Sequence, residues 1–116
     1  MITIYGIPNC DTMKKAFAWL EAHEIEYQFH NFKKAGLEAS LLDGWIARVG
    51  WEPLLNRRGM MWRKLGSDTK TNIDLNSART LMLENPSIIK RPLLECGGKL
   101  TLGFSEESYR AVLERD

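Results

Sequence analysis

Three patterns follow one another within the first 31 residues and restrict the fold this chain can adopt. Ile2–Tyr5 is a short apolar, β-branched run closed by Gly6, which is typical of a buried strand. Asp11–His23 has helical periodicity and Ile25–Asn31 is again β-prone. The apolar positions of the helical stretch share one face: Met13, Ala16, Phe17 and Leu20. This order predicts a parallel βαβ unit with a right-handed crossover, whose active edge lies where the first strand ends.

The remainder of the chain predicts helices followed by a hairpin. Leu37–Val49 has helical spacing and ends at Gly50, and the stretch from Pro53 to Asn85 fits short helices. Two β-prone runs, Ile88–Cys96 and Lys99–Leu102, are joined by two glycines that tolerate the positive φ angles of a tight turn. A last helix, capped by Ser105, carries Tyr109, Val112 and Leu113.

This order of elements predicts the fold class. We expect an α/β protein with a thioredoxin-like mixed sheet, built from the βαβ unit, the β-hairpin and the C-terminal helix. The helical insertion occupies about residues 37–86, and the whole of residues 1–116 forms a single domain. Pro92 starts the strand that follows the insertion, where a residue without an N–H suits an edge or a special turn.

Cys10 is the strongest candidate for chemistry because it stands between the first strand and the first helix. There, backbone N–H groups and the positive end of the helix dipole favour a thiolate over a thiol. The alternative interpretation is that Cys10 is a small buried apolar residue, since free cysteines are often buried. For Cys96 the structural interpretation is favoured over a catalytic one. Its strand runs away from the Cys10 end of the sheet, so we expect Cys96 to be structural.

Composition excludes several other classes of protein. The chain has 116 residues and a net charge of +1, so no polyelectrolyte argument supports nucleic-acid binding. No apolar run is long enough to span a membrane and no signal peptide is evident, which predicts a cytoplasmic protein. His23 and His30 are not spaced as ligands with the two cysteines, so no metal site is expected. We expect core packing of the four tryptophans: Trp19, Trp45, Trp51 and Trp62.

Three segments together resemble the ArsC-like reductases of the thioredoxin superfamily, and most closely their YffB-type members. They are Ile4-Tyr5-Gly6-Ile7-Pro8-Asn9-Cys10-Asp11-Thr12-Met13-Lys14-Lys15-Ala16, then Asn56-Arg57-Arg58-Gly59 with Trp62-Arg63-Lys64-Leu65, and Pro86-Ser87-Ile88-Ile89-Lys90-Arg91-Pro92-Leu93. The resemblance implies that Cys10 is the redox nucleophile, that Arg91 binds an oxyanion or thiolate, and that Pro92 is the cis residue of the fold. Arg58 aligns best with a further site arginine of related proteins, and Arg57 is a close competitor.

The resemblance implies a glutathione-dependent thiol–disulfide oxidoreductase that uses a single cysteine. Glutathione is the implied co-substrate, no cofactor is bound, and the partners are a small or protein disulfide, with glutaredoxin as a further one. Cations near the site suit the carboxylates of glutathione, and Thr12 is placed to hydrogen-bond the Cys10 sulfur. The candidate substrate-binding residues are Asn9, Thr12, Lys14, Lys15, Arg57 and Pro92.

Two alternative functions follow from other members of the same family. Arsenate reduction is disfavoured, because Gly6 and Gly103 stand where those enzymes carry a histidine and an arginine that help to bind the anion. Spx-type regulators dock RNA polymerase and most of them switch through a Cys-x-x-Cys disulfide. Met13 occupies the second position of that motif here, which removes the switch but leaves a regulatory binding module as an alternative.

Overall fold

A computed structural model describes residues 2–113 of the chain. It divides into two compact units that are described separately. The first unit holds the residues up to Ala35 together with those from Arg91 onward, and the second is the continuous segment Gly36–Lys90. The second unit therefore interrupts the first in sequence.

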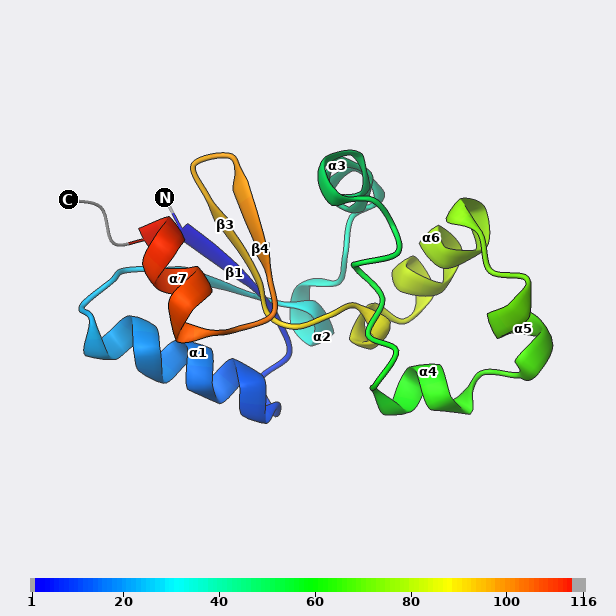
Figure 1. Cartoon of the computed structure of the whole chain (residues 1–116), viewed down its shortest axis with the longest axis horizontal. Helices are drawn as coiled ribbons and strands as arrows, with labels where there is room; N and C mark the ends of the chain where they lie inside the picture. Colours follow the sequence, from blue (N-terminus) through cyan, green and yellow to red (C-terminus); the bar gives the residue numbers. More distant parts are fainter. Residues whose placement is uncertain (1, 114–116) are drawn as a thin grey trace. The chain divides into compact units, whose positions relative to one another are not determined.

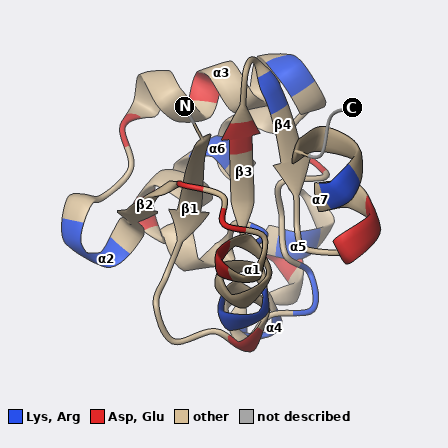
Figure 2. Ribbon diagram, turned by 90° about the vertical axis from the view of Figure 1, so that its left-hand side faces the viewer, with Lys and Arg blue, Asp and Glu red and all other residues tan. Residues whose placement is uncertain are grey.

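The first unit is built on a four-stranded mixed sheet (Figures 1 and 2). The strands are β1 (Ile2–Gly6), β2 (Gln28–Asn31), β3 (Leu93–Cys96) and β4 (Lys99–Leu102). Their order across the sheet is β2-β1-β3-β4, and β1 pairs parallel with β2 and antiparallel with β3. This arrangement is the predicted βαβ unit extended by the predicted hairpin.

Helices α1 (Asp11–Ala22) and α7 (Glu106–Leu113) cover one face of the sheet (Figure 1). Ile4 and Leu94 are directly paired across β1 and β3, and both are fully buried against these two helices. The other buried members of this core come from the helices: Met13, Ala16, Trp19, Leu20 and Tyr109. The helical periodicity of the sequence thus identifies the packed face of α1, with Phe17 only partly buried beside it.

Glycine and serine residues form the β3–β4 turn and the start of α7 in this unit. Gly97 and Gly98 have φ angles of 54° and 83°, so the β3–β4 turn uses the left-handed region that glycine enters readily. The backbone N–H of Ser108 donates to the Ser105 hydroxyl at 3.0 Å, and this bond caps α7 as the sequence predicts.

The second unit is helical and has its own core. Its elements are α3 (Ala39–Val49), α4 (Met60–Lys64), α5 (Ser67–Thr71), α6 (Leu75–Glu84) and the 3₁₀ turn η1 (Pro86–Ile88). The buried apolar side chains are Leu42, Trp45, Leu54, Leu55, Ala78, Met82, Ile88 and Ile89. Asp74 accepts from the backbone N–H of Ser77 at 2.9 Å and forms a capping box that starts α6.

The structure corrects several predicted elements. The strand expected over Ile88–Cys96 begins only at Leu93, because Pro86 starts a 3₁₀ turn and Ile89 then forms an isolated bridge with Leu55. The strand expected over Ile25–Asn31 is reduced to β2, and it is followed by an unpredicted short helix, α2 (Phe32–Ala35).

The prediction of core packing holds for Trp19 and Trp45, whereas Trp51 and Trp62 are half-buried and lie outside the buried core. Trp62 is half-buried, and the guanidinium of Arg57 lies 5.3 Å from its ring centroid while Lys70 Nζ lies at 5.8 Å. The ring therefore packs under cations at the surface. No helix among residues 2–113 is long and apolar enough to cross a membrane.

Gly6, the last residue of β1, is packed directly against Met13. A Cβ added at Gly6 would lie 2.5 Å from Met13 Sδ, and Met13 is fully buried. We therefore expect Gly6→Ala to lower the free energy of unfolding by about 1–3 kcal/mol through overpacking, measured by urea denaturation.

A matched glycine provides the control for this prediction. A Cβ at Gly44, inside α3, meets no atom within 4 Å, so Gly44→Ala should raise stability by up to about 1 kcal/mol. In a Met13→Ala background the cost of Gly6→Ala should shrink, because the clashing sulfur is gone. An equal cost in both backgrounds would show that the contact with Met13 is not its cause.

Candidate active site

Cys10 occupies the N-cap position of α1. Its backbone is extended, with φ −146° and ψ 127°, and its carbonyl accepts the first helical hydrogen bond from Lys14 N–H at 3.0 Å. The connection that leads to it runs from the end of β1 through the exposed Pro8 and Asn9. The thiol is half-buried, packed against the edge of the α1–α7 core while remaining accessible to a reactant.

The surroundings of Cys10 favour its ionised form. Burial by itself raises the pKa of the thiol, whereas hydrogen bonding from the Met13 backbone, the Arg91 side chain and the Thr12 backbone lowers it. The positive charge of Arg91 adds to this effect, so the pKa of Cys10 lies below its ordinary value.

The sheet register places Arg91 beside Cys10. Tyr5 pairs with Leu93, so the two residues before β3 lie next to the point where β1 ends and the Cys10 connection begins. The Arg91-Pro92 peptide bond is cis, and the Pro92 carbonyl accepts from Gly103 N–H at 2.8 Å. The antiparallel pairing of β1 and β3 thus brings together two residues that are distant in sequence.

The other predicted substrate-binding residues of the first unit lie around the start of α1. Thr12 is one of the groups that lower the pKa of Cys10, and it acts through a backbone hydrogen bond. Asn9, Lys14 and Lys15 are exposed. Neither lysine contributes to lowering the pKa of Cys10, so their predicted role is confined to binding a ligand.

Cys96 lies at the opposite end of the sheet from Cys10. It pairs with Ile2, the first residue of β1, whereas Cys10 follows the last residue of that strand. Both cysteines are free thiols. The antiparallel register therefore keeps Cys96 from acting as a resolving thiol for Cys10 within the same chain.

Arg57 and Arg58 lie in the second unit, where they line one pocket of about 370 Å³. The sequence did not single out two other charged residues of this pocket, Glu52 and Lys90. Lys90 directly precedes Arg91 in the sequence, and this position is the signal that could have suggested Lys90 as a site residue.

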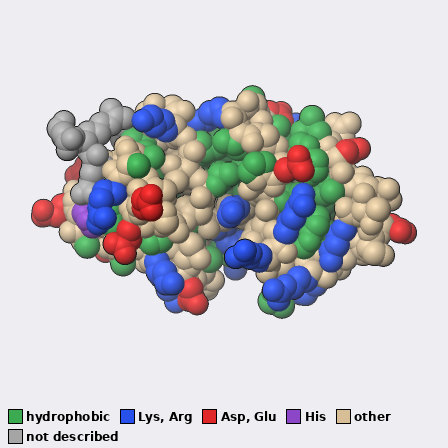
Figure 3. Space-filling model, in the orientation of Figure 1, with side chains coloured by type: hydrophobic (Ala, Val, Ile, Leu, Met, Phe, Trp, Pro, Cys, Tyr) green, Lys and Arg blue, Asp and Glu red, His purple; other side chains and the backbone are tan. Residues whose placement is uncertain are grey.

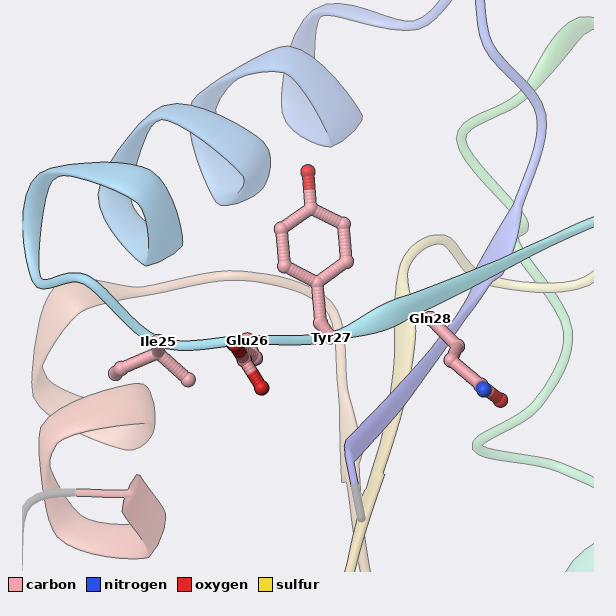
Figure 4. Close-up of a pocket in the computed structure, with 4 residues that line it drawn as sticks. All are labelled: Ile25, Glu26, Tyr27 and Gln28. Carbon is pink, nitrogen blue, oxygen red and sulfur yellow. The ribbon is translucent and has the colours of Figure 1, made fainter.

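A further pocket, of about 430 Å³, lies beside the segment that leads into β2 (Figure 4). Ile25, Glu26, Tyr27 and Gln28 line it, and Tyr27 points toward α1, where its hydroxyl donates to Glu21 Oε2 at 3.1 Å. It contains no cysteine and none of the predicted site residues. Within residues 2–113, no group of His, Cys, Asp and Glu side chains is arranged to hold a metal ion.

Comparison with known proteins defines the class of this protein. The fold is similar to that of a glutaredoxin from Archaeoglobus fulgidus, with a TM-score of 0.50. The match covers 98% of this chain and 86% of the glutaredoxin, at 17% sequence identity. This similarity shows a thioredoxin-like fold. A profile of the ArsC family matches residues 5–112. The chain therefore belongs to the ArsC family.

Individual relatives cover almost the whole chain. A protein named YffB is 45% identical over 97% of this chain and 99% of its own, with a TM-score of 0.92. An arsenate reductase (ArsC) related protein from Brucella melitensis is 54% identical over 98% and 95%, with a TM-score of 0.81. The global transcriptional regulator Spx of Streptococcus pyogenes is 30% identical over 100% of this chain and 87% of its own.

Proposed function

We propose that this protein is a glutathione-dependent thiol–disulfide oxidoreductase with Cys10 as its single nucleophile. The observation that carries the proposal is the lowered pKa of Cys10, which has its cause in the start of α1 and in Arg91. A thiolate is the reactive form in disulfide exchange, and a half-buried sulfur at a helix N-terminus is accessible enough to react. Membership of the ArsC family agrees with this chemistry.

The proposed reaction consists of two balanced exchanges. The Cys10 thiolate attacks the glutathionyl sulfur of a mixed disulfide, a Cys10–glutathione bond forms, and the other thiol leaves as a thiolate that takes up a proton. The thiolate of a second glutathione then attacks the same sulfur, which releases oxidised glutathione and regenerates the Cys10 thiolate. One substrate disulfide is reduced and one glutathione disulfide is formed, so no resolving cysteine is needed.

Arg91 has two roles in this proposal. Its hydrogen bond and charge stabilise the Cys10 thiolate before attack and again when that thiolate leaves the mixed disulfide. The backbone of Arg91 is proposed to pair with the backbone of bound glutathione, and Pro92, the next residue, is proposed to line the same site. Arg58, with Arg57 as its neighbour, is proposed to bind an anionic group of the substrate.

Two glycines weigh against arsenate as the substrate. A side chain at Gly6 would collide with Met13, and Gly103 has a φ of 75°, which an arginine rarely adopts. The histidine and the arginine that the family resemblance places at these positions are therefore sterically disfavoured here. Arsenate needs several charge-assisted donors, so this site suits a disulfide better than that dianion.

A coupled assay tests the proposal. The purified chain is incubated with glutathione and a small glutathionyl mixed disulfide, and the oxidised glutathione formed is measured through NADPH consumption by glutathione reductase. We expect turnover that depends on both thiol substrates. Absence of turnover with small and protein mixed disulfides alike would contradict the proposal.

The relationship to Spx supports a second candidate function, a regulatory module that docks RNA polymerase. This function needs the fold but not the thiolate. Binding of the purified chain to purified polymerase, compared between wild type and Cys10→Ser, separates the two candidates. Equal, tight binding by both proteins together with no thiol exchange would favour the regulatory module.

A further inference from the structure

The pocket of the second unit carries charges of both signs that do not neutralise one another. Glu52, Arg57, Arg58 and Lys90 are all exposed and all line it. Among the residues that the structure describes, none of these four side chains forms an ion pair. Three cations and one carboxylate are therefore available to a ligand within one pocket.

Backbone hydrogen bonds hold the two walls of this pocket together. Lys90 N–H donates to the Leu54 carbonyl at 2.7 Å, and Asn56 N–H donates to the Ile88 carbonyl at 2.9 Å. Leu55 and Ile89 form the antiparallel bridge between these bonds, and their side chains are buried in the core of the unit. Lys90 is thus fixed opposite the segment that carries the two arginines.

The arginines themselves are partly positioned. Arg57 lies over the Trp62 ring, and the backbone N–H of Arg58 donates to Asn56 Oδ1 at 3.2 Å in the turn that precedes α4. Gly59 closes this turn, where an added Cβ would lie 2.8 Å from Asn56 Nδ2. Figure 3 shows basic side chains gathered over the part of this unit that contains α4.

We propose that this pocket binds the charged ends of a small zwitterionic peptide, and that glutathione is such a ligand. Glutathione carries two carboxylates and one ammonium group, which complement the cations and Glu52 respectively. Pro53 supplies an exposed apolar surface for the peptide, and the pocket volume of about 370 Å³ lies within the usual range for small-molecule sites. The choice of glutathione rests on the proposed function.

This proposal assigns a role to two residues beyond the arginines already considered. Glu52 accepts the ammonium group, and Lys90 provides a third cation for a carboxylate. The distinguishing consequence is that affinity depends on the amino group of the ligand as well as on its carboxylates. A merely basic surface would bind any anion and would gain affinity when Glu52 is neutralised.

Titration of the Cys10→Ser chain with S-methylglutathione tests the inference without any thiol chemistry. We expect Glu52→Gln to weaken binding about fivefold, the upper end for an exposed ion pair, and to leave the affinity for N-acetyl-S-methylglutathione unchanged. Lys90→Gln should weaken both ligands, and Lys64→Gln, an exposed residue of α4 that does not line the pocket, should weaken neither.

Unchanged or tighter binding of S-methylglutathione to Glu52→Gln would overturn the inference, as would backbone NMR shifts that leave residues 52–58 and 90 unmoved. The two proposals fail in different ways. Loss of turnover with intact peptide binding would contradict only the thiol exchange, whereas turnover without this binding pattern would contradict only the pocket assignment.

Discussion

Cys10→Ser should reduce glutathione-dependent reduction of a mixed disulfide to the uncatalysed background. A serine hydroxyl cannot form the covalent disulfide intermediate, and no second cysteine within reach takes over, because Cys96 lies at the far end of the sheet. The measurement is the initial rate of formation of oxidised glutathione in the coupled assay.

Cys96→Ser is the matched control for this substitution. It removes the other free thiol of the chain and should leave turnover close to that of the wild type. Thermal denaturation of both variants separates a loss of chemistry from a loss of folding. Retention of substantial activity by Cys10→Ser, or equal losses in the two variants, would contradict the assignment of the nucleophile.

Arg91→Met should raise the pKa of Cys10 and slow thiol exchange about tenfold or more at neutral pH. The substitution removes both the side-chain hydrogen bond and the charge that favour the thiolate, while burial continues to oppose ionisation. Because the pKa of the thiol rises, the activity that remains should recover as the pH increases. The rate of mixed-disulfide reduction is measured as a function of pH.

Arg110→Met provides the control for charge alone. Arg110 is an exposed arginine of α7, 3.9 Å from Glu106, and it is not among the groups that act on Cys10. Its loss should leave the pH profile in place. The assignment would be contradicted if Arg91→Met left the pH–rate profile unchanged. It would also be contradicted if both substitutions shifted the profile equally, because the effect of Arg91 on Cys10 would then not be specific.

The sequence was most informative where the structure depends on local patterns. The position of Cys10 before α1, the buried face of that helix, the glycine turn of the hairpin and the Ser105 cap all follow from short-range periodicity or turn chemistry. The pairing of Arg91 with Cys10 came from the family resemblance, and the β1–β3 register supplies its physical basis.

The features that escaped prediction depend on contacts between distant residues. Ile88 and Ile89 are β-prone, but Pro86 and the bond from Lys90 N–H to the Leu54 carbonyl direct them into a turn and a bridge. Glu52 and Lys90 share a pocket only because of that bridge. Likewise, nothing in the local sequence indicates that Met13 fills the space beside Gly6.

The most direct test of the central claim is the pH dependence of Cys10 alkylation in the Cys96→Ser protein, with free glutathione as the reference thiol in the same buffers. Since ionisation controls the rate, a lowered pKa shifts the whole profile to lower pH. We expect Cys10 to reach its maximal rate at a lower pH than glutathione does. A profile that coincides with that of glutathione, or lies at higher pH, would contradict a thiolate stabilised by α1 and Arg91.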